Sequence, residues 1–239
     1  MTDFIELTEQ LERVHTARLA LRPIALCDAW PLFASTRNPE FNKNLLWLQP
    51  QDDVPVLDRI QTIMDVARRG GMTALSAVLK STGEWVSLYR FQPYEADVSL
   101  VEMGIWTHEK FWKNRYSFEL TQACIDAAFT LTDIPLLIGG ASPDNIGSCR
   151  ILERCGLKPL AVIHRHSETD VERKSQEFKI TREEWLSQRS FGTFSYVCEA
   201  PILPNKHPAP AGFSEVRGEM TRMNAENAGH APSFGSAFV

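Results

Sequence analysis

The residues best suited to chemistry lie in one stretch, residues 101–119. A strand-like run that carries the carboxylate of Glu102 leads into a short loop, and the loop leads directly into a helix that begins near Tyr116. The first amide groups of a helix have no partners within it and carry a partial positive charge. Two cations, Lys113 and Arg115, precede this helix and add donors for phosphate oxygens. The stretch therefore predicts a site for a diphosphate group, provided that the loop arranges these donors around it.

Other chemistries find no support in the sequence. The phosphate-loop pattern GxxxxGK(S/T), the dinucleotide pattern GxGxxG and the nucleophile-elbow pattern GxSxG do not occur. The five cysteines are odd in number and irregular in spacing, which fits neither a disulfide framework nor a zinc site. His164 and His166 share one face of a predicted strand, but no third ligand lies nearby in the sequence. We therefore expect no metal site.

Periodicity outlines the elements that must position these groups. Apolar residues at helical spacing predict helices over 4–14, 28–36, 54–69, 116–131 and 145–155. Alternating or wholly apolar runs predict strands over 16–24, 73–80, 85–92, 97–107, 135–140, 157–166 and 172–180. Asp28 is the predicted cap of the second helix, and a capping box from Thr181 to Glu184 opens a short last helix. This order predicts an α/β protein with one mixed sheet and helices on both faces.

Composition bounds the class of protein. The chain has 239 residues, of which 44% are hydrophobic and 23% charged, so one domain with a real core is expected. A net charge of −5 gives no global electrostatic case for nucleic acid or a membrane surface. The start of the chain lacks the features of a signal peptide, and no apolar run is long enough to cross a membrane. We therefore expect a cytoplasmic protein that binds neither nucleic acid nor membrane.

The last forty residues differ in composition from the rest. Residues 201–239 hold five of the 14 prolines and four of the 13 glycines, with few apolar residues to bury. Such segments do not form a packed core. The expected organisation is one domain over residues 1–199, followed by a disordered tail rich in Pro, Gly and Ala over residues 200–239.

Several motifs in register resemble one family. The run from Glu102 to Trp106, then Phe111–Trp112 and the helix start at Tyr116, look like the GNAT superfamily of acetyltransferases. Residues 16–23, 82–84, 144–157 and 180–185 resemble further segments of the branch that contains the ribosomal-protein N-terminal acetyltransferases (Rim-like). The resemblance covers about residues 16–185. It implies the GNAT fold, with a mostly antiparallel central sheet, a splayed strand pair and helices on both faces.

The resemblance also implies a donor, acetyl-coenzyme A, and a place for it. Its pantetheine arm would lie between strands 102–107 and 136–141, and its diphosphate would lie at the loop before Tyr116. The implied donor-binding residues are Gly104, Ile105, Trp106, Thr107, Trp112, Lys113, Asn114, Arg115, Tyr116, Ser117 and Asn145. The family usually places two glycines where this chain has Lys113 and Arg115. We therefore expect the loop to lose the freedom to take positive φ, and the two cations to contact phosphate instead.

Two residues are implied to act in catalysis. Acyl transfer needs a deprotonated amine and a route for protonating the thiolate. Glu102 is the candidate base, acting through a water; the alternative is a surface residue on the outer face of its strand. Many members of the family use a tyrosine as the acid, but residues 145–156 contain none. Ser148 is the substitute candidate, because relatives in this branch place a hydroxyl near the sulfur at this position. It alternatively stabilises the start of its helix, as Asn145 also does if it caps the helix rather than bonding pantetheine.

Three functions are compatible with this resemblance. The first is transfer of an acetyl group from acetyl-coenzyme A to a primary amine, either a protein N-terminus or a small molecule. The second uses another carrier, an acyl carrier protein or a longer acyl-coenzyme A. The third is a catalytically inactive binding module with the same fold. For the enzyme, the partners are a coenzyme-A thioester and an amine acceptor, and the chain is a monomer or a homodimer.

Overall fold

The computed structural model describes residues 2–43, 54–166, 172–189 and 196–198. The chain divides into two units, residues 1–204 with 235–239, and residues 205–234. All described residues belong to the first unit. The tail predicted over residues 200–239 lies outside the described residues.

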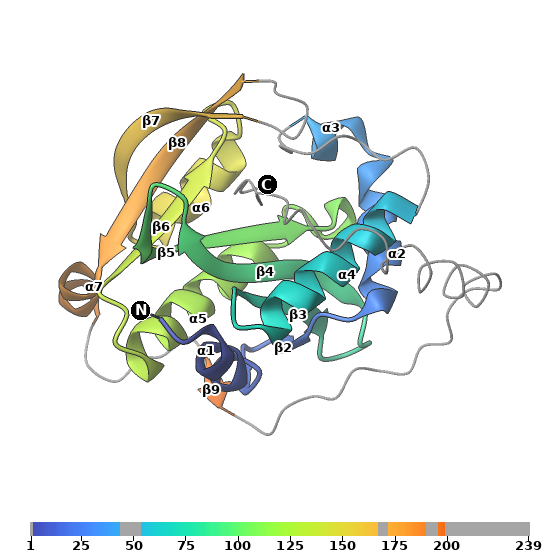
Figure 1. Cartoon of the computed structure of the whole chain (residues 1–239), viewed down its shortest axis with the longest axis horizontal. Helices are drawn as coiled ribbons and strands as arrows, with labels where there is room; N and C mark the ends of the chain where they lie inside the picture. Colours follow the sequence, from blue (N-terminus) through green and yellow to red (C-terminus); the bar gives the residue numbers. More distant parts are fainter. Residues whose placement is uncertain (1, 44–53, 167–171, 190–195, 199–239) are drawn as a thin grey trace. The chain divides into compact units, whose positions relative to one another are not determined.

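The described residues form one sheet with helices around it (Figure 1). The strands are β1 Val14–His15, β2 Leu19–Pro23, β3 Thr73–Leu79, β4 Trp85–Tyr94, β5 Asp97–Thr107, β6 Leu136–Ala141, β7 Lys158–His166, β8 Glu172–Thr181 and β9 Val197–Cys198. The helices are α1 Phe4–Leu11, η1 Leu26–Asp28, α2 Ala29–Thr36, α3 Pro39–Asn42, α4 Val54–Arg68, η2 Glu109–Phe111, α5 Tyr116–Leu131, α6 Ile146–Arg154 and α7 Arg182–Gln188. The strand order is β7-β8-β6-β5-β4-β3-β2-β1-β9, and among these pairs β5 and β6 run parallel while the others run antiparallel.

One face of the sheet carries the main apolar core. Successive side chains of a strand point to opposite faces, so Phe91 of β4 and Met103 of β5, which are paired, share this face. Both are buried against α1 and α5, which lie side by side in Figure 1. Trp185 of α7 closes the core over Phe129, with ring centroids 5.4 Å apart. This packing holds α5, and hence the loop before it, at a defined position on β5.

The other face of the sheet buries charge. Arg90, Glu102 and Arg165 point to it, and their exposed fractions are 3%, 0% and 5%. Helix α4 covers part of this face through its contacts with β3, and α2 packs on α4. Burial of a charged group costs free energy unless the group is paired. Buried charges are common at functional sites, so this face is the candidate location of the active site.

Most predicted elements are confirmed. The helix predicted over residues 116–131 has those bounds, and Gly156 ends α6 with φ +91°. The capping box at Thr181 is present, because Thr181 accepts from the Glu184 amide at 3.1 Å. The fold has the predicted class: a mixed α/β sheet, mostly antiparallel, with helices on both faces.

Three local predictions need correction. Helix α1 ends at Leu11 rather than at Val14, and Val14 belongs to strand β1 instead. Helix α3, Pro39–Asn42, was not among the predicted elements. Asp28 does not cap α2 with its side chain. Its carboxylate is instead buried and accepts from Arg22 and from Ser76, because two neighbouring strands bring these donors to it. Tertiary partners here replaced a local cap.

Candidate active site

The parallel pair of strands splays apart, as predicted. Pairing runs from Val101 with Leu137 to Met103 with Gly139 and does not continue. Beyond that point β5 continues to Thr107 beside β4, and the last residues of β6, Gly140 and Ala141, pair only with β8. Glu102 itself still pairs with Ile138, so the strands separate after Met103. Backbone groups of residues 104–107 that point away from β4 therefore have no strand partner, and they suit an extended amide-bearing ligand.

The loop before α5 keeps the backbone shape that glycines usually supply. Lys113 and Arg115 both have φ +64°, and they are the non-glycine residues with positive φ in the described part of the chain. The expectation that these side chains abolish this conformation is therefore wrong. A non-glycine residue pays about 1–2 kcal/mol for the left-handed region. Neighbouring contacts must hold the loop in this shape.

Hydrogen bonds fasten the loop to the end of β5. The Trp112 indole N–H donates to the Thr107 carbonyl at 2.9 Å. The Thr107 hydroxyl lies 2.9 Å from the Ser117 hydroxyl and 2.8 Å from the Ser87 hydroxyl. Three of the predicted donor-binding residues, Thr107, Trp112 and Ser117, thus use these side-chain groups to position the loop.

The start of α5 offers the donors that the loop was predicted to present. No side chain caps this helix, and the first backbone bond onto its cap runs from the Glu119 amide to the Arg115 carbonyl at 3.0 Å. The amides before Glu119 have no intrahelical acceptor. Lys113, Asn114 and Arg115 are exposed around them, while Tyr116 packs under the Arg18 guanidinium at 4.1 Å. Free amides and two cations at a helix start fit a diphosphate.

Glu102 is buried and ion-paired. Its side chain is fully excluded from solvent, so the alternative that it is a surface residue is wrong. The Arg165 Nη2 donates to one carboxylate oxygen at 2.8 Å, and Gln92 donates to the other at 3.3 Å. The guanidinium stabilises the negative charge of Glu102 at this buried position. The residue lies two positions before Gly104, where the splay begins.

Arg90 lies across the same face and was missed by the sequence reasoning. A Cβ on Gly104 would approach the Arg90 Nε to 3.0 Å, and the guanidinium carbon lies 5.3 Å from the centre of the Trp106 ring. Burial lowers the pKa of Arg90 to about 10, with Glu102 acting in the opposite direction. Arg90 is therefore protonated at neutral pH. Ile105, between these two positions, points to the apolar core instead.

Ser148 and Asn145 start the helix that follows β6. The Asn145 side chain accepts from the Ser148 amide at 3.1 Å, so Asn145 caps α6. Ser148 is buried, and its hydroxyl makes no hydrogen bond with the part of the chain that the structure describes. That hydroxyl is thus available to a ligand near the carboxyl end of β6.

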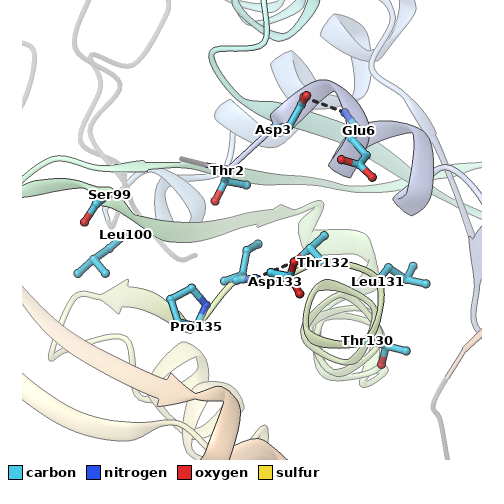
Figure 2. Close-up of a pocket in the computed structure, with 11 residues that line it drawn as sticks. Thr2, Asp3, Glu6, Ser99, Leu100, Thr130, Leu131, Thr132, Asp133 and Pro135 are labelled. Atoms are coloured by element: carbon cyan, nitrogen blue, oxygen red, sulfur yellow. Dashed lines mark hydrogen bonds between the residues drawn. The ribbon is translucent and has the colours of Figure 1, made fainter.

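A groove of about 660 Å³ lies elsewhere. Figure 2 shows it between the N-terminal residues Thr2 and Asp3 and residues 130–135, which end α5 and lead to β6. The helix rises 1.5 Å per residue, so this groove lies roughly 20 Å along α5 from the loop at Arg115. Asp3 is already engaged as the cap of α1. The groove is separate from the donor loop.

The described residues contain neither a metal-binding cluster nor a membrane-spanning helix. No group of three or more His, Cys, Asp or Glu side chains that could hold a metal ion occurs among them. Of the helices within the described ranges, none is long and apolar enough to span a membrane.

Comparison with known proteins identifies the family. The family model described as an acetyltransferase (GNAT) domain matches residues 18–158, more than half of the chain. The chain therefore belongs to the GNAT acetyltransferases, and it is an enzyme of the acyltransferase class. It is 27% identical over 142 residues to the uncharacterized N-acetyltransferase p20 of Bacillus licheniformis, across 59% of this chain and 80% of that protein.

Solved structures share the fold. An acetyltransferase of the GNAT family from Bacillus anthracis superposes with a TM-score of 0.61 at 16% identity, covering 71% of this chain and 98% of that one. RimJ of Mycobacterium smegmatis, in complex with a coenzyme-A disulfide, gives 0.60 at 19% identity, covering 72% of this chain and 88% of that one. These likenesses show that the chain has the fold of these acetyltransferases.

Proposed function

We propose that this protein transfers an acetyl group from acetyl-coenzyme A to a primary amine, which is either a protein N-terminus or a small molecule. The observation that carries the proposal is the positive φ of Lys113 and Arg115. The loop keeps a glycine-like shape at a cost in conformational energy. Such a cost is tolerated where a backbone must present its amides to a ligand.

The proposed donor lies along β5. Its diphosphate accepts from the amides at the start of α5 and from the side chains of Lys113 and Arg115. Its pantetheine arm takes the edge of residues 104–107 that β6 leaves unpaired. The thioester then lies near Gly104, on the face where Glu102 and Arg90 are buried.

The proposed reaction is direct attack of the amine on the thioester carbonyl. Glu102 accepts the proton of the incoming ammonium group through a water, so the amine attacks in its neutral form. The amine nitrogen forms a bond to the carbonyl carbon, and the bond from carbon to sulfur breaks. The Ser148 hydroxyl is the proposed proton donor to the thiolate that leaves, and the second proton that the attacking nitrogen loses as the amide forms returns to the Ser148 oxygen, directly or through a water. Backbone amides of residues 104–106 stabilise the oxyanion between these steps.

Calorimetric titration with acetyl-coenzyme A tests the donor. We expect binding that Arg115→Ala and Arg115→Gly weaken about 10- to 100-fold, as loss of a charged hydrogen bond to phosphate does. Arg115→Lys retains the charge and should weaken it less. Glycine at position 115 relieves the strain of the positive φ, whereas alanine does not. Equal losses of affinity in the two variants therefore assign the effect to the missing Arg115 side chain. No heat of binding at millimolar donor would overturn the proposal.

A further inference from the structure

Four side chains from four strands meet in one buried cluster on the face that carries Glu102. The cluster consists of Tyr94 of β4, Glu102 of β5, Arg165 of β7 and Glu177 of β8. Glu102 and Glu177 are 0% and 1% exposed. The sequence places Arg165 63 residues from Glu102, so no local motif predicts the contact. The cluster lies beside the first pairs of β5 with β6, next to the splay.

Arg165 joins the two carboxylates through a single nitrogen. Its Nη2 donates to Glu102 at 2.8 Å and to Glu177 at 2.9 Å. Its Nη1 lies 3.5 Å from Glu95, which is 74% exposed at the end of the cluster. Its Nε, although buried, has no partner within the described residues. One guanidinium, with a single positive charge, is therefore shared by two carboxyl groups that are both excluded from water.

Glu177 is held by a second donor. The Tyr94 hydroxyl donates to its other oxygen at 2.8 Å, and burial with this bond raises the pKa of Tyr94 to about 12. Tyr94 is therefore neutral and remains a donor at any pH at which the enzyme is assayed. Glu177 thus competes with Glu102 for the same nitrogen of Arg165.

The surroundings of Glu102 show how much depends on Arg165. Within the described ranges, the charged or titratable groups around Glu102 include Arg90 and Tyr94 from β4, Glu95 from the turn after β4, Arg165 from β7 and Glu177 from β8. Arg59 of α4 interacts electrostatically with Arg90. Of these, Arg165 donates a hydrogen bond to the Glu102 carboxylate at 2.8 Å. Opposite charges at this distance favour the ionised form of a carboxyl group by far more than remote ones do.

We infer that Arg165 is a positioning residue for the proposed base. It keeps Glu102 ionised and fixes the orientation of its carboxylate beside the splay. Glu177 weakens the interaction between Arg165 and Glu102, because it accepts a hydrogen bond from the same nitrogen. The inference rests on the proposed function, in which Glu102 accepts the proton of the amine. Replacement of either partner should therefore change the pH at which Glu102 becomes a base, and in opposite directions.

Variants of the cluster give opposite expectations for the acidic limb of kcat/KM against pH. Arg165→Met removes the cation, so the acidic limb should shift to higher pH by about 1–3 units. Arg165→Lys retains a cation and should move it less. Glu177→Gln removes a competing negative charge, so the acidic limb should shift to lower pH. Arg173→Met is the matched control, because Arg173 pairs with Arg165 across β7 and β8 but is exposed and contacts the Lys43 carbonyl.

A second readout does not depend on turnover. With glutamate labelled at the side-chain carboxyl carbon, the NMR signal of Glu102 is assigned by its loss in Glu102→Gln, and its titration midpoint is followed in each variant. Midpoints that move up in Arg165→Met and down in Glu177→Gln support the inference. If removal of the buried cation prevents folding, Glu177→Gln and Arg165→Lys still decide it. An unmoved or raised midpoint in Glu177→Gln would overturn it.

The two readouts separate the inference from the function on which it rests. If the wild-type protein transfers no acetyl group to any amine tested, the proposed function fails and the midpoints alone decide the role of Arg165. If it transfers acetyl groups while midpoints and limbs stay unmoved in the variants, the proposed function stands and Arg165 is only structural.

Discussion

At the scale of single residues, Glu102 combines burial with a charged partner, a combination that recurs at catalytic positions. Structural ion pairs also bury carboxylates, so the two roles must be separated by kinetics. A structural carboxylate supports the fold without taking part in proton transfer. A base contributes to the chemical step itself.

For Glu102→Gln we expect kcat to fall about 10²- to 10⁴-fold, the usual contribution of a general base. Binding of acetyl-coenzyme A should stay within about twofold, because none of the proposed donor contacts involves the Glu102 side chain. Steady-state kinetics with a fixed amine and calorimetry on the same samples check both statements. Glu172→Gln, an exposed change on β8, is the control. Equal kcat in the two variants would remove Glu102 from the mechanism.

Asn145 and Ser148 have separable roles. Asn145→Ala removes a helix cap, which costs about 0.5–2 kcal/mol of stability. Ser148→Ala should leave the urea midpoint almost unchanged, because the Ser148 hydroxyl bonds nothing in the described structure, but it should lower kcat. Urea denaturation and turnover measured on both variants check this. A loss of stability in Ser148→Ala with full activity would assign Ser148 to the helix start instead.

At the scale of elements, the loop before α5 holds a left-handed backbone at two residues that are not glycine. Its shape is imposed from outside by the bonds of Trp112 and of the Thr107 hydroxyl, not by glycine. The left-handed backbone of Lys113 and Arg115 is therefore a local cost that the rest of the fold sustains.

The double variant Lys113→Gly/Arg115→Gly should raise the free energy of unfolding by about 1 kcal/mol. The strain energy that glycine removes from the left-handed backbone is larger than the stability that is lost because glycine makes the unfolded chain more flexible. Asn114→Gly is a matched control between the two positions; Asn114 has no positive φ, so the same change should destabilise by about 0.4–1 kcal/mol. Urea denaturation of the three proteins measures both signs. Destabilisation of the double variant would contradict the strained backbone.

At the scale of the whole molecule, the core contains groups that must stay protonated. Burial raises the pKa of the Cys155 thiol from 9.0 to about 12, and it raises the pKa of the Cys124 thiol and of Tyr89 well above their ordinary values. All three belong to the apolar core under α5 and α6. Ionising any of them in the folded state would place a charge among apolar side chains.

Stability should therefore fall as pH rises above about 9. In the unfolded chain the thiols lose their protons near that pH, while in the folded chain they keep them until about 12 for Cys155. The unfolded state then binds fewer protons, and each thiol lowers the free energy of unfolding by about 1.4 kcal/mol per pH unit in this window. Urea midpoints between pH 7.5 and 10.5, under reducing conditions, measure the slope. Cys155→Ala should flatten it, and an equal slope would contradict this assignment.

Local signals in the sequence determined the elements. Helical spacing of apolar residues specified α5, and the polar pair Thr181 and Glu184 specified the start of α7. Gly156 specified the end of α6, since positive φ costs glycine little. The fold class followed from the order of these elements and from the family motifs. The start and end of each of these helices depend on residues only a few positions apart.

Tertiary structure alone decided the chemistry of the site. The cluster of Glu102, Arg165 and Glu177 forms because β5, β7 and β8 carry these residues to one face of the sheet. Alternation along a strand tells which residues share a face, but strand pairing decides which strands meet. The same holds for Lys113 and Arg115. Their propensity opposes positive φ, and contacts from β5 overrule it. Local patterns define elements, whereas the charge and strain of an active site arise from what packs beside them.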